Sequence, residues 1–184
     1  MRESIFPPPP VPTVGSLVTL AQQQTAAEFE RSFGRAVLVG PPGEGEGRAE
    51  DDPWAFNTVS FGSVTDKTPE QMDSFRESLV FGVKKAGPGA FADTILIGRS
   101  SSNDICIADA SLSKLHARIH LRDDDSMVIT DSGSKNGTTV NGRLLGKKDE
   151  AKLRHGDEVQ FGTRTFKVYA TSRLHSVLAK LVPS

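Results

Sequence analysis

The sequence predicts an all-β fold, a sandwich or a barrel, for the second half of its 184 residues. Short runs rich in β-branched and aromatic residues follow one another closely from residue 79 to residue 171. Turn residues separate these runs, among them two Asn-Gly pairs at 136–137 and 141–142. Residues 117–121 alternate apolar and polar side chains, so one face of that strand is expected to be buried.

The chain before this region is expected to begin with an arm and a helix. Residues 1–15 include a run of four prolines, which favours an extended proline-rich arm. A helix is predicted from Ser16, which can cap it, to about Phe33, with Gly34 ending it. Apolar residues recur along this helix at a loose helical spacing, at Val18, Ala21, Ala26, Phe29 and Phe33.

A short strand and a loop are expected next. Ala36–Val39 is an apolar run typical of a strand, and residues 40–52 have the Gly, Pro and acidic composition of a flexible linker. Gly40 and Gly45 have the glycine spacing of a phosphate-binding P-loop. However, Glu46-Gly47 stands where that motif requires Lys followed by Ser or Thr, so the P-loop interpretation is rejected.

Residues 16–78 as a whole are interpreted as an N-terminal extension of the β-rich region, with an acidic Gly/Pro-rich loop. A further strand is predicted at Trp54–Phe61. A short helix is predicted to begin at Thr68-Pro69, because Thr68 can cap it and proline suits the first helical position. This helix is expected to end near residues 75–76.

Residues 79–171 are expected to hold eight short strands. They are predicted at Leu79–Lys84, Thr94–Gly98, Ile105–Ile107, His116–Leu121, Met127–Thr130, Thr138–Val140, Val159–Phe161 and Phe166–Ala170. Residues 172–184 then form a small helix, whose apolar residues recur every 3.6 residues. Such a helix docks either on the β-rich region or on a partner, and docking on the β-rich region is the favoured interpretation.

Charge is distributed unevenly along a chain whose net charge is −1. Residues 1–78 hold six Lys or Arg against twelve Asp or Glu, whereas residues 79–171 hold fourteen against eleven. The second region is mildly basic, which suits an anionic ligand, but its charges of both signs are interspersed, which disfavours nucleic acid. The sequence contains no apolar run of about 18 residues, the length that a membrane-spanning helix needs, so no membrane span is predicted. The single cysteine, Cys106, permits no intramolecular disulfide, which favours a cytoplasmic location.

Polar groups lie at the ends of several strand-like runs. Arg99 follows the run at 94–98, Ser113 and Lys114 precede the run at 116–121, and Lys135 and Asn136 lie in a later loop, before the run at 138–140. A guanidinium, a hydroxyl and an amide between strands suit recognition of a phosphate on another protein. None of these groups forms a nucleophile with a base, so the pattern indicates a binding module and not an enzyme.

Seven short motifs occur in order across residues 79–171. They are Gly98-Arg99-Ser100, Asn103-Asp104-Ile105, Ser113-x-x-His116, Lys135-Asn136-Gly137-Thr138, Val140-Asn141-Gly142, His155-Gly156-Asp157 and Phe161-Gly162. Together they resemble the forkhead-associated (FHA) domain, and residues 1–78 show no such resemblance. The resemblance implies a two-sheet antiparallel β-sandwich of the FHA/SMAD-like type that binds phosphothreonine peptides through loops at one end.

The resemblance also implies a role for each binding residue. Arg99 is expected to direct its guanidinium at one phosphate oxygen and Ser113 to donate its hydroxyl to another, with Lys114 as a second cationic donor. Asn136 is expected to hold the peptide backbone beside the phosphothreonine. Lys135 is expected either to add a phosphate contact or to alter the preference for neighbouring peptide residues.

Three further residues are expected to support the site without touching the ligand: Gly98, His116 and Gly137. His116 is expected to hold the binding loops by hydrogen bonds. The four histidines share no metal-ligand spacing, so neither a metal nor another cofactor is expected. The alternative interpretation of Asn136 is a left-handed turn residue before Gly137, and Asn141-Gly142 is interpreted only as a hairpin turn.

Two classes of function are therefore weighed. The favoured one is a phosphothreonine-dependent adaptor in Ser/Thr kinase signalling, whose partner is a phosphothreonine-containing protein such as a Ser/Thr kinase or its substrate. The alternative is a phosphate-independent scaffold or assembly protein that uses the N-terminal extension and the surfaces of the sandwich. Neither a nucleic acid nor a membrane is expected as a partner.

Overall fold

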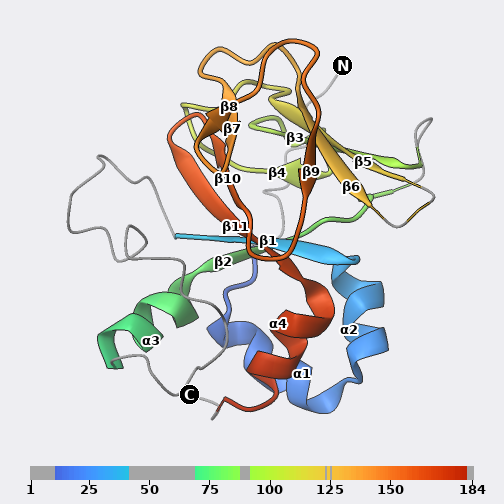
Figure 1. The fold of residues 1–184 in the computed structure, drawn as a ribbon. Coiled ribbons are helices and arrows are strands. Elements are labelled where there is room, and N and C mark those ends of the chain that lie inside the picture. The colour runs from blue at the N-terminus through green and yellow to red at the C-terminus, as the bar shows by residue number, and fades with distance from the viewer. Residues whose placement is uncertain (1–10, 42–68, 88–91, 123, 125, 182–184) are drawn as a thin grey trace.

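The computed structural model describes residues 11–41, 69–87, 92–122, 124 and 126–181. Two β-sheets pack face to face, and helices cover the outer face of one of them (Figure 1). This arrangement confirms the predicted all-β sandwich with small helical parts. The predicted strand at 54–61 and most of the 40–52 loop lie outside the described residues.

The first sheet has six strands in the order β2-β1-β11-β10-β7-β8, and every neighbouring pair is antiparallel. Their bounds are β1 (Ala36–Gly40), β2 (Leu79–Gly82), β7 (Thr138–Val140), β8 (Arg143–Leu144), β10 (Glu158–Phe161) and β11 (Arg164–Ala170). Asn141 and Gly142 form the β7–β8 hairpin turn as predicted. Both have the positive φ that such a two-residue turn requires, 50° and 79°.

The second sheet has five strands in the order β4-β3-β5-β6-β9. Their bounds are β3 (Thr94–Gly98), β4 (Ile105–Cys106), β5 (Ala117–Leu121), β6 (Met127–Asp131) and β9 (Ala151–Leu153). All pairs are antiparallel except β3 with β4, which is parallel. The eight strands predicted in residues 79–171 are all present, whereas β8 and β9 were not predicted.

The main hydrophobic core lies between the two sheets. Side chains from both sheets alternate into it, as the period of two along a strand requires. The fully buried large residues at its centre are Leu38, Ile95, Ile97, Ile119, Ile129, Phe161 and Phe166. Burying a side chain of this size stabilises the fold by about 1.5–3 kcal/mol.

Strand β1 is covered on both faces, and all five of its residues are buried. Leu38 faces the core between the sheets, while Val37 and Val39 face a second core under the helices. A strand covered on both sides needs an uninterrupted apolar run, which the sequence at 36–39 supplies. Sequence reasoning assigned this strand to the N-terminal extension, but it lies within the sandwich, hydrogen-bonded between β2 and β11.

The helix predicted over residues 16–33 is wrong in its continuity. The structure has a 3-10 turn at Gly15–Leu17, then α1 (Val18–Gln23) and a separate helix α2 (Ala26–Phe33). Gln24, whose backbone is extended, ends the first helix, and Thr25 caps the second: Thr25 N donates to Glu28 Oε2 (2.8 Å), and Glu28 N donates to Thr25 Oγ1 (3.3 Å). This reciprocal capping box satisfies two backbone donors and fixes the break.

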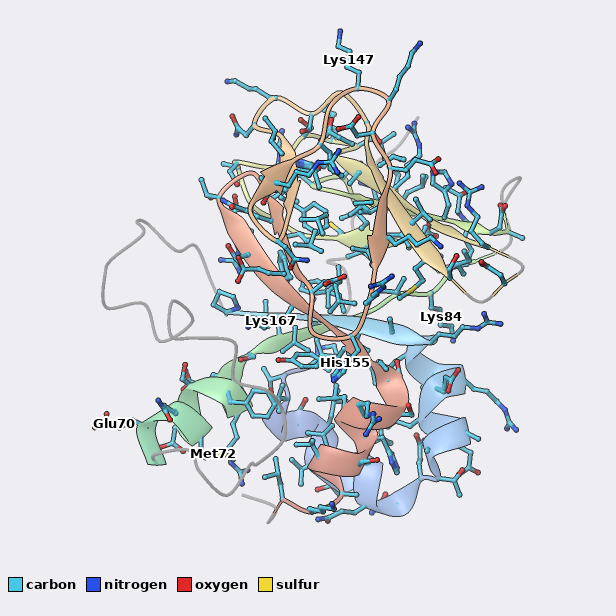
Figure 2. The ribbon with its side chains drawn as sticks, viewed as in Figure 1. Glu70, Met72, Lys84, Lys147, His155 and Lys167 are labelled. Atoms are coloured by element: carbon cyan, nitrogen blue, oxygen red, sulfur yellow. The ribbon has the colours of Figure 1, made fainter. Side chains whose placement is uncertain are left out.

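Helices α3 (Pro69–Glu77) and α4 (Thr171–Leu178) complete the helical layer. The C-terminal helix docks on the protein's own surface as expected, with Leu174 and Leu178 fully buried in the second core. Figure 2 shows His155 at the boundary between the sandwich and the helices, where its ring lies 5.5 Å from that of Tyr169 on β11. No helix within the described ranges is long and apolar enough to cross a bilayer.

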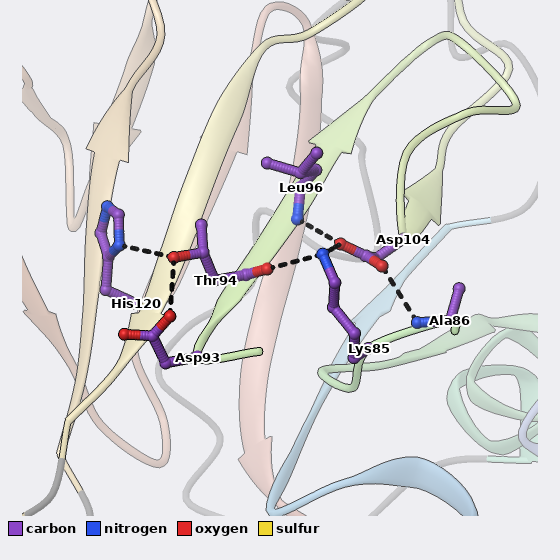
Figure 3. Close-up of polar contacts among 7 residues, drawn as sticks. All are labelled: Lys85, Ala86, Asp93, Thr94, Leu96, Asp104 and His120. Carbon is purple, nitrogen blue, oxygen red and sulfur yellow. Dashed lines mark hydrogen bonds and ion pairs between the residues drawn. The ribbon is translucent and has the colours of Figure 1, made fainter. Parts of the chain in front are cut away.

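A buried carboxylate ties the segment after β2 to β3 (Figure 3). Asp104 accepts hydrogen bonds from Leu96 N (2.8 Å), Ala86 N (3.0 Å) and Lys85 Nζ (3.0 Å). Burial opposes the charge on Asp104, but these hydrogen bonds and the ammonium of Lys85 outweigh it and lower the pKa of the carboxyl. Asp104 therefore anchors the β3–β4 loop at the end that adjoins β4.

Candidate functional site

The site lies in the loops that follow β3, precede β5 and join β6 to β7. Two backbone hydrogen bonds hold the first two loops together: Arg99 N donates to Ser113 O (2.9 Å), and Ser100 N donates to Lys114 O (3.2 Å). The chains approach so closely that a Cβ on Gly98 would lie 2.4 Å from the oxygen of Lys114. Only glycine fits there, so Gly98 allows Arg99 to lie directly beside Ser113.

The side chain of Arg99 is exposed, but a hydrogen bond to the backbone fixes its orientation. Its Nε donates to the carbonyl oxygen of Leu112 (3.2 Å). Within the described residues this is the only hydrogen bond of the guanidinium, so both terminal nitrogens keep their protons for a ligand. A guanidinium whose Nε is fixed by a hydrogen bond and whose terminal nitrogens are free is suited to bind an anion.

Ser113 is half-buried, and its hydroxyl is already used as an acceptor. Lys135 N donates to Ser113 Oγ at 3.0 Å. Because this bond occupies a lone pair, the hydroxyl proton is left to donate to another group. The same bond brings the β6–β7 loop against the segment before β5, and the side chains of Lys114 and Lys135 are exposed beside it.

A carboxylate at the end of β6 shapes the loop that carries Lys135 and Asn136. Asp131 accepts from Gly133 N (2.8 Å), Ser134 N (2.9 Å), Ser134 Oγ (2.6 Å) and Thr138 Oγ1 (2.7 Å). Ser134 Oγ in turn accepts from the backbone N–H of residue 137 (2.9 Å). Burial opposes the charge of Asp131, but the hydrogen bonds outweigh it and lower its pKa, so the carboxylate is charged at neutral pH.

Asn136 has an exposed side chain tied to the neighbouring loop. Its Nδ2 donates to Ser111 O at 2.8 Å, which leaves the amide oxygen and the second amide proton available. The alternative of a left-handed turn residue does not hold, because Asn141 is the only non-glycine residue with positive φ in the described ranges. The hydrogen bond to Ser111 O sets the orientation of the Asn136 amide, and a left-handed backbone conformation of Asn136 does not.

His116 is fully buried and bridges two of the loops. Ser113 N donates to His116 Nδ1 (3.1 Å), so the ring proton is assigned to Nε2, which donates to the carbonyl oxygen of Gly137 (3.0 Å). The ring also meets Phe161 edge-on, with centroids 5.7 Å apart. In this geometry His116 holds the loops in place and presents no nitrogen to a ligand.

Gly137 occupies a position that only glycine suits. Its φ is +80°, and a Cβ there would lie 2.7 Å from Leu144 Cδ1. Leu144 is a large apolar side chain that is 63% exposed on the neighbouring edge strand. The positive φ of Gly137 lets the loop turn directly after Asn136.

Two contributors to the site were missed by sequence reasoning. Asn103, 8% exposed, donates from Nδ2 to both Ser100 O (2.9 Å) and Lys114 O (2.6 Å), which locks the loop beyond Arg99. Ser111 supplies the carbonyl that Asn136 uses. Asn103 was noticed only as part of a motif, and nothing in the local sequence marks Ser111 as a partner of residue 136.

Cys106 lies beside the site, where its Sγ donates to Arg99 O at 3.5 Å. Burial raises the pKa of the Cys106 thiol, which keeps it protonated at neutral pH. Among the described residues no group of three or more His, Cys, Asp or Glu side chains is arranged to hold a metal ion.

The loops therefore bring all five predicted binding residues to one end of the sandwich. Arg99, Ser113, Lys135 and Asn136 each make a hydrogen bond to or within the short segment 111–114, which also carries Lys114. Three positive charges, the free hydroxyl proton of Ser113 and the free amide oxygen of Asn136 are available there. A β-sandwich with such a loop cluster defines the class of protein: a module that recognises an anionic group on another chain.

Comparison with known proteins identifies the family. The family profile described as FHA domain matches residues 95–162. The oxoglutarate dehydrogenase inhibitor of Corynebacterium jeikeium is 34% identical over 107 residues, which cover 55% of this chain and 72% of that protein. The chain belongs to the FHA-domain family.

Further relatives match over shorter stretches. The glycogen accumulation regulator GarA of Mycobacterium tuberculosis is 38% identical over 86 residues, covering 44% of this chain and 51% of GarA. Among solved structures, the FHA domain of the CT664 protein from Chlamydia trachomatis has a TM-score of 0.41 and 31% identity, covering 49% of this chain and 83% of that one. FHA domains are binding modules for phosphothreonine-containing proteins, and this chain contains one.

Proposed function

We propose that this protein is a phosphothreonine-dependent adaptor in Ser/Thr kinase signalling, and that residues 79–171 together with β1 form its binding domain. The observation that carries the proposal is the hydrogen-bonded convergence of three loops on segment 111–114, with donors left free to bind. The partner is a phosphothreonine-containing protein, such as a kinase or its substrate.

The phosphate is bound by Arg99, Ser113 and Lys114. Phosphothreonine carries about −1.5 to −2 charges at neutral pH, so the two free nitrogens of Arg99 make the strongest contacts. Ser113 donates its hydroxyl proton, and the ammonium of Lys114 acts as a point charge. Each charge-assisted hydrogen bond contributes about 1.5–3 kcal/mol, so an unphosphorylated peptide forfeits most of the polar affinity.

The peptide backbone is bound by Asn136. Its free amide oxygen accepts a backbone N–H beside the phosphothreonine, while Ser111 O holds the amide from behind. Lys135 lies next to it with an exposed ammonium and adds charge for the phosphate or for an acidic neighbour. Gly98, His116 and Gly137 act only by holding these side chains in place.

The site works by binding and not by chemistry. Ser113 Oγ receives its hydrogen bond from a backbone N–H, and the nearby imidazole of His116 bonds to Ser113 N instead, so this hydroxyl has no general base. We place the protein in the cytoplasm, since its one cysteine permits no intrachain disulfide.

The alternative, a phosphate-independent scaffold or assembly protein, uses the N-terminal extension, the C-terminal helix and the surfaces of the sandwich. In the structure the apolar sides of α1, α2 and α4 are turned inward onto β1, β2 and β11. Those helices are engaged within the chain itself, which supports the phosphate-dependent function over the scaffold.

The test compares a phosphothreonine peptide with its unphosphorylated copy by isothermal titration calorimetry. Arg99→Ala is expected to weaken phosphopeptide binding by at least about 100-fold, the equivalent of about 3 kcal/mol. Arg122→Ala is the matched control, because Arg122 follows the opposite end of β5 and its side chain is 48% exposed. Equal affinity of the wild type for both peptides would refute the proposal.

A further inference from the structure

The start of β11 carries an unusual charged residue. Arg164 is only 5% exposed, and its Nη2 donates to Pro41 O at 2.6 Å. Within the described residues its Nε and Nη1 have no hydrogen-bond partner, although Nε lies 3.8 Å from Asp109 Oδ2. A buried guanidinium costs free energy unless its charge is paired, and among the described residues the group that faces this charge is the carboxylate of Asp109.

The carboxylate of Asp109 lies between Arg164 and Ser111 and contacts both. One of its oxygens faces Arg164, while Oδ1 accepts from Ser111 N (2.8 Å) and from Ser111 Oγ (2.6 Å). Its side chain is 12% exposed, so the charge is held in a poorly solvated place and depends on Arg164 for compensation. Asp109 therefore sets the orientation of Ser111 through two hydrogen bonds.

Ser111 is also held by the turn between β10 and β11. Thr163 N and Thr163 Oγ1 both donate to Ser111 Oγ, at 3.1 and 3.0 Å. Gly162, with φ of +61°, presses on the same residue so closely that a Cβ would lie 2.7 Å from Ser111 O. The carbonyl of Ser111 is the group that accepts from Asn136.

We propose that Arg164, Asp109 and Ser111 are positioning residues for phosphopeptide binding, which act together to fix the amide of Asn136. Arg164 holds Asp109, Asp109 holds Ser111, and the carbonyl of Ser111 orients Asn136. None of the three touches the ligand. The inference rests on the proposed function, because it assigns to Asn136 the contact with the peptide backbone.

A double-mutant cycle on the full chain, read by phosphopeptide affinity, tests the relay. Asn136→Ala is expected to weaken binding about tenfold, and Asp109→Ala and Ser111→Ala about three- to tenfold each. In the Asn136→Ala background, Asp109→Ala and Ser111→Ala are expected to change affinity less than about twofold, since the group they position is already gone. In the Lys114→Ala background, Asp109→Ala and Ser111→Ala are expected to keep their full effects, because Lys114 binds the phosphate independently of Asn136. The fold-changes in affinity then multiply.

Arg164 has its own pair of variants. Arg164→Met is expected to reproduce the loss caused by Asp109→Ala, again only while Asn136 is present, and Arg164→Lys, which keeps a cation facing Asp109, is expected to restore most of the affinity. A purely structural role would lower affinity equally in every background. Urea unfolding of each variant establishes that binding is measured on folded protein.

The inference is overturned if Asp109→Ala and Arg164→Met weaken binding by the same factor with and without Asn136, or if Arg164→Met binds as the wild type does. A wild type that fails to distinguish the phosphorylated from the unphosphorylated peptide refutes the proposed function instead. Discrimination of the peptides by the wild type, with no effect of Asn136→Ala, refutes the relay and leaves the phosphate contacts of Arg99 standing.

Discussion

Removing the carboxylate of Asp131 should damage both the fold and the binding site. Asp131 accepts four hydrogen bonds inside the 131–138 loop, one of them from the hydroxyl of Thr138, which is fully buried. In Asp131→Ala the Thr138 hydroxyl and the Ser134 donors lose their acceptor. A buried donor without a partner costs about 1–3 kcal/mol, so we expect a loss of about 3 kcal/mol in unfolding free energy.

Asp131→Asn should be milder. Its amide oxygen can still accept from the backbone N–H groups of Gly133 and Ser134, and the hydroxyls of Ser134 and Thr138 can rotate to accept from the new NH₂ group. The variant loses the charge assistance and leaves the hydroxyl protons of Ser134 and Thr138 without this acceptor, but it keeps a hydrogen bond at every contact, so we expect a loss of about 1–2 kcal/mol. Because the loop also carries Lys135 and Asn136, we expect Asp131→Ala to weaken phosphopeptide binding about tenfold through the cost of ordering it.

The assays are urea unfolding, read as a change in midpoint at constant slope, and calorimetric titration of a phosphothreonine peptide. Asp124→Ala is the matched control, since Asp124 accepts from Ser126 N (3.1 Å) and Ser126 Oγ (2.6 Å) in an exposed turn at the far end of the second sheet. We expect it to cost less than about 1 kcal/mol and to leave affinity unchanged. If Asp131→Ala matched this control in both assays, the reasoning about the loop would be wrong.

The sign of the pH dependence follows from the lowered pKa of Asp131. Its folded-state pKa lies below the unfolded value of about 3.9, so its stabilisation is complete above about pH 4 and is lost as the pH falls through the folded-state pKa. The stability difference between the wild type and Asp131→Ala should therefore be constant from pH 8 to pH 5. It should shrink only in stronger acid.

Three further outcomes are expected. Gly98→Ala should destabilise the fold and weaken binding together, because the new Cβ would meet Lys114 O at 2.4 Å and push two loops apart; unfolding and titration of the same sample check both. Thr25→Ala should lose about 1 kcal/mol of stability with its capping box, and phosphopeptide affinity should not change. Phosphopeptide affinity should fall as the pH drops through about 6, where the phosphate takes up its second proton; titrations at pH 5 and pH 7 measure this.

Most strands could be predicted because each pairs an apolar alternation with turn residues at its ends. The strands β8 and β9 escaped prediction because their sequences, Arg-Leu and Ala-Lys-Leu, contain no β-branched or aromatic residue, unlike the equally short β4 and β7. They exist only because β7 and β6 offer them a hydrogen-bonding edge. Their formation is a tertiary effect that no local pattern records.

The break between α1 and α2 did have a local signal. Thr25 is followed three residues later by Glu28, the capping-box pattern, but the apolar stripe on both sides suggested one continuous helix. The stripe continues because both helices face the same second core. Hydrophobic spacing therefore predicted which side is buried and could not reveal where the helix ends.

The candidate site was predictable where its residues sit in motifs. Arg99, Ser113 and Asn136 stand at the ends of strands, and the structure places them in one cluster of loops. The supporting pair of Arg164 and Asp109 could not have been found, because it joins positions far apart in sequence and buries a charge in a strand. A sequence pattern marks the exposed polar residues and says nothing about which buried groups hold them.

The structure of the complex with a phosphothreonine peptide, by crystallography or by NMR, tests the central claim most directly. We expect one phosphate to lie within about 3 Å of both Arg99 and Ser113, and a backbone N–H of the adjoining peptide residue to bond to Asn136. A phosphate bound at another surface, or one that contacts Arg99 while Ser113 and Asn136 face empty solvent, would contradict the account.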